Sequence, residues 1–152
     1  MVEIKTPDST ITTHFFAQVT AWNYAIEALG GGRVEGAWRG EPRNAFRGIP
    51  APSDFFLAQS FMTEPEYWTP GAEQSAQQWR AVGLSEVTAP SAKAVLHDPQ
   101  EGISGSPIFF ADGHGALKFL RDAGAGVPNS LEGNLNRPCV TTAQGARGRD
   151  YP

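Results

Sequence analysis

The sequence is poor in several features that mark whole classes of protein. It has one cysteine, Cys139, which excludes an intrachain disulfide and a cysteine-rich zinc site. Charged residues make up 18% of the chain, and the net charge is −4. The densest basic run is Arg147-Gly148-Arg149, which is too short to indicate a nucleic-acid-binding surface. No signal peptide is visible, and no apolar run approaches the about 18 residues of a membrane span.

Glycine, proline and aromatic residues are abundant instead. The 152 residues include 17 glycines and 12 prolines, which indicates many turns and irregular loops and argues against a helical bundle. Nine phenylalanines and four tryptophans offset the modest aliphatic content, because each aromatic side chain buries a large area. A chain of this length suits one domain, and we expect a single domain over residues 1–152.

The strongest helical pattern lies near the N-terminus, over about residues 11–29. Its apolar residues recur at helical spacing and form one stripe: Ile11, Phe15, Val19, Trp22, Ile26 and Leu29. The run Gly30-Gly31-Gly32 ends this predicted helix. We expect a loop-rich region over about 30–83, a sheet over about 84–122 and an irregular C-terminal arm over 123–152.

The segment Ser106–Asp122 predicts a β-hairpin. Apolar side chains alternate on both sides of Asp112-Gly113, a dipeptide that favours the positive φ angles of a tight hairpin turn. A two-residue loop at Asp112-Gly113 or at Gly113-His114 gives the same parity. Either loop predicts one buried face, made of Ile108, Phe110, Leu117 and Phe119.

The same hairpin resembles the C-terminal part of type IV pilin-like proteins. The similarity covers roughly Leu84–Asp122 and includes the Ala89-Pro90-Ser91 turn, the strand that follows it, and the aromatic-Ala-Asp-Gly-His segment. The most similar group is the prepilin-type proteins of planctomycetes, which are relatives of the type II secretion pseudopilins. Their signature is His-x9-Asp-Gly, whereas here His97 precedes Asp112 by fifteen positions.

The resemblance implies a fold class and a function. The fold is α+β, with a long N-terminal helix packed on an antiparallel meander and with long loops. The function is that of a structural, non-enzymatic subunit of a secretion or pilus system, with other pilin-like subunits as its partners. Such a protein is anchored in the inner membrane and faces the periplasm or the cell surface in its full-length form. We expect its membrane helix to be missing from this chain.

Calcium is the cofactor that we expect, if any. The meander register places Asp98, Glu101 and Asp122 near one end of the sheet, and Asn134, Asn136 and Asp150 of the arm could reach them. Carboxylate and amide oxygens are the ligands that calcium prefers. Major pseudopilins carry a calcium site beside this part of the sheet, so the resemblance favours the same interpretation.

A small hydrolase of the esterase or lactonase type is an alternative. It would use Ser104 or Ser106 with a histidine, or a metal bound at the Asp98, Glu101 and Asp122 end of the sheet. However, Gly102–Ser106 differs from the Gly-x-Ser-x-Gly nucleophile elbow and precedes a strand instead of following one. The three histidines, His14, His97 and His114, lie in different predicted elements, which argues against a shared site.

A carbohydrate- or partner-binding module is a further alternative. Trp38, Tyr67 and Trp68 lie in proline- and glycine-rich contexts, where aromatic side chains can anchor a ligand. We favour the interpretation that these side chains fold back over the core. The binding module requires all three to be exposed together.

Overall fold

The computed structural model describes residues 2–5, 10–13, 55–99, 102–132 and 136–152. The chain divides into two compact units, Met1–Phe56 and Leu57–Pro152. No helix in the described ranges is long and apolar enough to cross a membrane.

The described part of the N-terminal unit is a two-stranded antiparallel sheet. Strand β1 (Val2–Lys5) pairs with β2 (Thr10–Thr13), so that Ile4 lies opposite Ile11. The prediction that a helix begins at Ile11 is wrong, because Ile11 lies in β2. Three of the four residues in β2 are threonine and the fourth is isoleucine, and such β-branched residues favour strands over helices. Residues 14–29 of the predicted helix lie outside the described residues.

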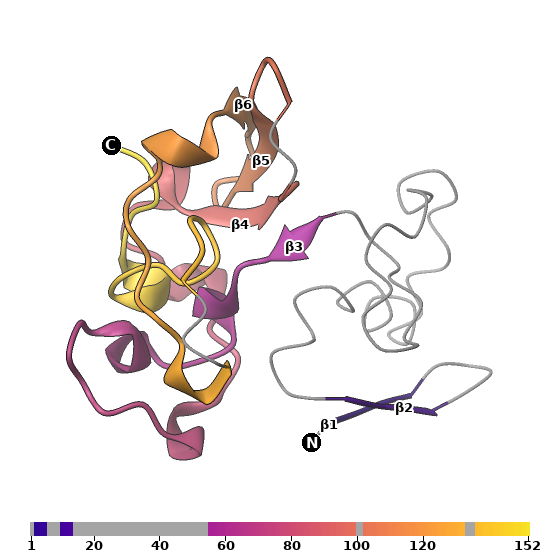
Figure 1. The fold of residues 1–152 in the computed structure, drawn as a ribbon, viewed down its shortest axis with the longest axis vertical. Helices are drawn as coiled ribbons and strands as arrows, with labels where there is room; N and C mark the ends of the chain where they lie inside the picture. The colour runs from indigo at the N-terminus through magenta and orange to yellow at the C-terminus, as the bar shows by residue number, and fades with distance from the viewer. Residues whose placement is uncertain (1, 6–9, 14–54, 100–101, 133–135) are drawn as a thin grey trace. The chain divides into compact units, whose positions relative to one another are not determined.

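The C-terminal unit is built on an antiparallel sheet. Its strands lie in the order β3 (Phe56–Leu57), β4 (Ala94–His97), β5 (Ser106–Phe110) and β6 (Gly115–Lys118). Strands β4, β5 and β6 follow one another as the predicted meander (Figure 1). The described residues contain no helix of seven residues or more, only short 3-10 turns, so the predicted α+β class with its long helix is wrong.

The hairpin between β5 and β6 has a loop of three residues, one more than predicted. Phe109 lies opposite Gly115, the Phe110 amide donates to the His114 carbonyl, and the Gly113 amide donates back to the Phe110 carbonyl at 2.9 Å. Gly113 has a φ of 90°. This is a turn followed by one residue in the left-handed region, a common form of three-residue hairpin.

The extra loop residue turns β6 over. A register shift of one residue moves every side chain of a strand to the other face. Ile108 and Phe110 are buried, as predicted, but Leu117 lies on the outer face opposite Pro107 and is 60% exposed. The prediction that Leu117 shares the buried face is therefore wrong.

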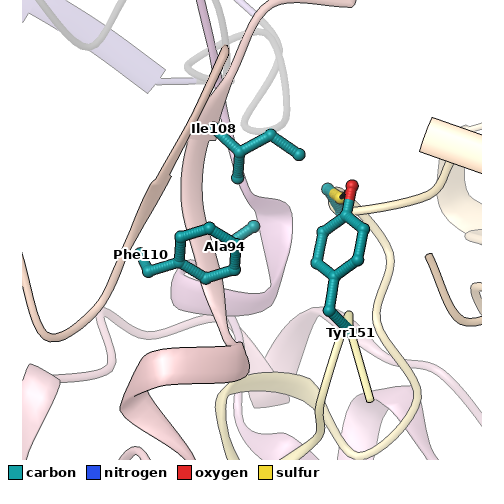
Figure 2. Close-up of a cluster of buried hydrophobic side chains, with 5 residues drawn as sticks. Ala94, Ile108, Phe110 and Tyr151 are labelled. Atoms are coloured by element: carbon teal, nitrogen blue, oxygen red, sulfur yellow. Dashed lines mark hydrogen bonds between the residues drawn. The ribbon is translucent and has the colours of Figure 1, made fainter. Parts of the chain in front are cut away.

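Two apolar clusters form the core of this unit. Figure 2 shows the first, in which the ring of Tyr151 from the arm faces side chains from β4 and β5. It consists of Ala94, Ile108, Phe110, Cys139 and Tyr151. Burial raises the pKa of the Cys139 thiol to about 12, which keeps it protonated as a packed side chain. The second cluster consists of Ala58, Phe61, Val82 and Ala146.

The C-terminal arm is irregular but well packed. The amide of Asp150 donates to the Ala92 carbonyl at 2.9 Å, and the Gly124 amide donates to the Asp150 carbonyl at 2.7 Å. The arm also has two non-glycine residues with positive φ, Cys139 and Gln144, which interrupt any regular element. The bond to Ala92 attaches the end of the chain to the segment that leads into β4, and the bond from Gly124 joins two parts of the arm.

Candidate functional site

The residues predicted to bind calcium do not form a recognisable metal site. Asp98 follows β4 and donates its amide to the Pro107 carbonyl at 3.1 Å. Asp122 is exposed at the end of a 3-10 turn (Leu120–Asp122), and Glu101 lies outside the described residues. Among the residues that the structure describes, no three histidine, cysteine or acidic side chains are grouped so as to hold a metal. Calcium binding stays a prediction.

The predicted turn residues, Asp112 and Gly113, lie in the loop between β5 and β6. The Asp112 carboxylate accepts the His114 amide at 3.1 Å and contacts the His114 Nδ1 at 2.6 Å. The backbone hydrogen bond and the ring of His114 lower the pKa of the Asp112 carboxyl. The His114 ring also stacks on Phe110, with the ring centroids 4.3 Å apart. These contacts brace the loop.

The geometry does not favour a serine hydrolase in this part of the chain. Ser106 is fully buried on β5, and its hydroxyl donates to the Asp98 carbonyl. Ser104 is exposed but precedes β5, whereas His114 lies in the loop that follows β5, at the opposite end of that strand. A buried hydroxyl that already donates to a carbonyl is poorly placed to attack a substrate.

Two of the three loop aromatics fold back into the interior. Tyr67 and Trp68, in the 3-10 turn Pro65–Trp68, are both 0% exposed. The Tyr67 hydroxyl donates to Asn129 Oδ1 at 2.6 Å, and the two rings meet edge to face at 4.8 Å. Trp38 lies outside the described residues. An exposed aromatic platform that needs Tyr67 and Trp68 is therefore not present.

An open depression lies at the C-terminal end of the arm. It is lined by Asp122, Ala123, Gly124, Arg149, Asp150, Tyr151 and Pro152. It is wide open, whereas a ligand pocket typically encloses most of its ligand.

The most unusual chemistry lies in a buried cluster that the sequence analysis missed. We call Lys93, Thr142 and Asp150 the Lys93 cluster. The Lys93 Nζ lies 3.0 Å from Asp150 Oδ2, and the two side chains are 0% and 1% exposed. Thr142 accepts a hydrogen bond from Lys93 Nζ and donates one to Asp150 Oδ1. Lysine and aspartate are almost never fully buried unless they are paired.

Two further groups complete the surroundings of this cluster. The Ala94 amide donates to Asp150 Oδ2 at 2.8 Å, and the Phe61 ring lies with its centroid 5.7 Å from Lys93 Nζ. Burial lowers the pKa of Lys93, against the attraction of Asp150, which raises it. The cluster joins the start of β4 to the end of the arm across 57 positions of sequence.

His97 is a second buried titratable group, on β4. Burial disfavours the charged imidazole and lowers the pKa of His97 from 6.5 to about 4. Between these two values the unfolded chain binds more protons than the folded one, so acid favours unfolding. The neutral ring is thus a structural feature of the folded sheet.

We predict that stability falls as the pH drops from about 6.5 to about 4. The contribution of His97 to the free energy of unfolding declines by up to about 1.4 kcal/mol for each pH unit in this window. Urea denaturation across the window measures it, with His97→Gln expected to show a flatter pH dependence. An NMR titration that places the pKa of His97 near 6.5 would contradict the prediction.

Comparison with family models, with curated proteins and with solved structures finds no significant match for this chain.

Proposed function

We propose that this chain is a non-enzymatic structural subunit that associates with other subunits through the outer face of its β5–β6 hairpin. One observation carries the proposal: Phe109 and Leu117 stand on that face and are 44% and 60% exposed. Clustered exposed apolar side chains on small domains often mark interaction surfaces.

The position of this face in the sheet favours contact between subunits. Strand β6 is the last in the strand order, so it is an edge strand of this sheet. Edge strands present N–H and C=O groups that can pair with another chain. The pairs Pro107–Leu117 and Phe109–Gly115 place the apolar side chains next to this edge.

The assembly that we propose is pilin-like. The resemblance of Leu84–Asp122 to type IV pilin-like proteins and pseudopilins points to a fibre of a secretion or pilus system on the outer side of the inner membrane. Such a fibre uses head-to-tail contacts, in which one surface meets a different surface of the next subunit and the arrangement does not close. The β5–β6 face is one such surface.

Self-association of the purified chain tests this proposal. Sedimentation velocity over a range of concentrations should reveal association, and Leu117→Lys should weaken it by about tenfold or more. Burying one leucine side chain contributes about 1.5–3 kcal/mol of free energy, and each 1.4 kcal/mol changes a dissociation constant about tenfold.

Leu84→Lys is a matched control, because Leu84 is 59% exposed and lies outside the hairpin. It should leave association unchanged. A chain that stays monomeric at every concentration, or a loss of association that is equal in the two variants, would refute the proposed interface.

A further inference from the structure

We propose that Lys93 and Asp150 become joined by an amide bond, which the folded chain forms by itself between Lys93 Nζ and the side-chain carbon Cγ of Asp150. The product is an intramolecular isopeptide cross-link. The inference stands on the Lys93 cluster alone and does not depend on the proposed function.

The first argument is the placement of the two reacting groups. Part of the barrier to the reaction of an amine with a carboxyl group is bringing the two into the right orientation, and a fixed geometry removes that part. Here Lys93 Nζ lies 3.0 Å from a carboxyl oxygen of Asp150, and both side chains are almost completely buried. Backbone bonds on either side hold the pair, since the Asp150 amide donates to the Ala92 carbonyl and the Ala111 amide donates to the Lys93 carbonyl, both at 2.9 Å.

The second argument is the protonation state. Amide formation needs an uncharged amine as the nucleophile and a protonated carboxyl group from which water can leave. Transfer of one proton from the ammonium to the carboxylate gives this neutral pair, and burial of both side chains disfavours the two separate charges. Burial also acts on Lys93 in this direction, because it lowers the pKa of the amine.

The third argument is the pair of hydrogen bonds that surround the carboxyl group. The Thr142 hydroxyl accepts from Lys93 Nζ and donates to Asp150 Oδ1, so it connects the nitrogen that loses protons to the oxygen that gains them. The Ala94 amide donates to the other oxygen, Oδ2, at 2.8 Å. A backbone N–H in this position stabilises the negative charge that develops on the oxygen in the tetrahedral intermediate.

The atoms of the step balance without any other reactant. One proton passes from the Lys93 ammonium through the Thr142 hydroxyl to Asp150 Oδ1. The Nζ lone pair then attacks Cγ, and a second proton follows the same route from Nζ to Oδ1. The Cγ–Oδ1 bond breaks and one water molecule leaves, while Oδ2 becomes the amide oxygen. No atom is oxidised or reduced.

Intact-mass spectrometry of the purified, denatured chain is the first test. We expect a mass below that of the sequence by one water molecule. Lys93→Met should have the full mass of its own sequence, whereas Lys118→Met, which removes an exposed lysine, should still lose one water. Loss of water from Lys93→Met as well would indicate a cyclic imide at Asp150 and would overturn the proposal.

Peptide mapping of the wild-type chain tests for the Lys93–Asp150 cross-link even if Lys93→Met fails to fold. Trypsin cleaves after Arg80, Lys93, Lys118 and Arg149. An acylated Lys93 resists cleavage, so we expect residues 81–118 as one peptide that carries the tripeptide Asp150-Tyr151-Pro152 as a branch. A wild-type chain of full mass, with cleavage after Lys93 and a free C-terminal tripeptide after prolonged incubation, would overturn the proposal.

Thr142→Val tests the proton relay separately. This variant keeps the shape of the side chain and removes the hydroxyl, so we expect the water loss after refolding to be at least tenfold slower while Lys93 and Asp150 remain in place. An unchanged rate would remove Thr142 from the mechanism as a positioning residue.

Discussion

Replacing Asp150 by alanine should lower the free energy of unfolding by about 3–5 kcal/mol, because it leaves a buried lysine without its partner. The loss is large beside the about 5–15 kcal/mol of a typical domain. Three donors meet at this carboxylate: Lys93 Nζ, the Thr142 hydroxyl and the Ala94 amide. Each loses this acceptor in the variant, although Lys93 Nζ still donates to Thr142, and a buried donor left unsatisfied costs about 1–3 kcal/mol. If the cross-link forms, its loss adds to the same effect.

Urea denaturation measures this prediction, and Asp122→Ala is the control. Asp122 is exposed at the end of a 3-10 turn, so its replacement should change the free energy of unfolding by no more than about 0.5 kcal/mol. The double variant Lys93→Met/Asp150→Leu should recover much of the stability that an ionic pair contributes, because apolar side chains of similar volume often replace a buried pair without loss. A loss below about 1 kcal/mol in Asp150→Ala would show that the carboxylate is not buried against Lys93.

The Lys93 cluster was not predictable from a single sequence. Lys93 and Asp150 are 57 positions apart, and no local spacing connects them. The sequence pattern indicates Asp150 only as a possible calcium ligand in a polar, irregular arm. A lone lysine before a strand is expected to be exposed, since its charge is costly to bury. Only the tertiary path of the arm brings the two groups together.

The hairpin was predictable in outline but not in register. Alternation identified β5 and its buried residues Ile108 and Phe110, and Asp112-Gly113 lies in the connecting loop. The same dipeptide suits loops of two and of three residues, and these loops place Leu117 on opposite faces. The prediction of a helix start at Ile11 is wrong for a different reason. The apolar periodicity from Ile11 onward favours a helix, whereas the β-branched residues of Thr10–Thr13 favour a strand, and the strand forms.

Replacing Trp68 by alanine should cost about 3–5 kcal/mol of stability, the usual range for truncating a buried tryptophan. The side chain is fully buried and lies against the backbone of the arm. A Cβ atom on Gly145 would come within 2.8 Å of the Trp68 ring, and the Gln144 amide donates to the Trp68 carbonyl at 3.0 Å. The alanine variant would leave a cavity between the turn Pro65–Trp68 and the arm.

Two further variants sharpen this prediction. Trp68→Phe should lose less than Trp68→Ala, because the phenyl ring leaves a smaller cavity. The Trp68 Nε1–H has no hydrogen-bond partner among the described residues, so its removal costs no bond there in either variant. Leu84→Ala, at an exposed position, should stay within about 0.5 kcal/mol of the wild type. Urea denaturation followed by circular dichroism compares all three without relying on tryptophan emission.

The result also discriminates between functions. An aromatic side chain that serves a binding surface can be removed with little effect on stability, whereas a core side chain cannot. If Trp68→Ala folds as stably as the wild type, Trp68 is exposed in solution, and a carbohydrate- or partner-binding role for this turn becomes the better explanation. If stability falls as expected, Trp68 is a core side chain that supports the arm, and an exposed binding role for this turn is excluded.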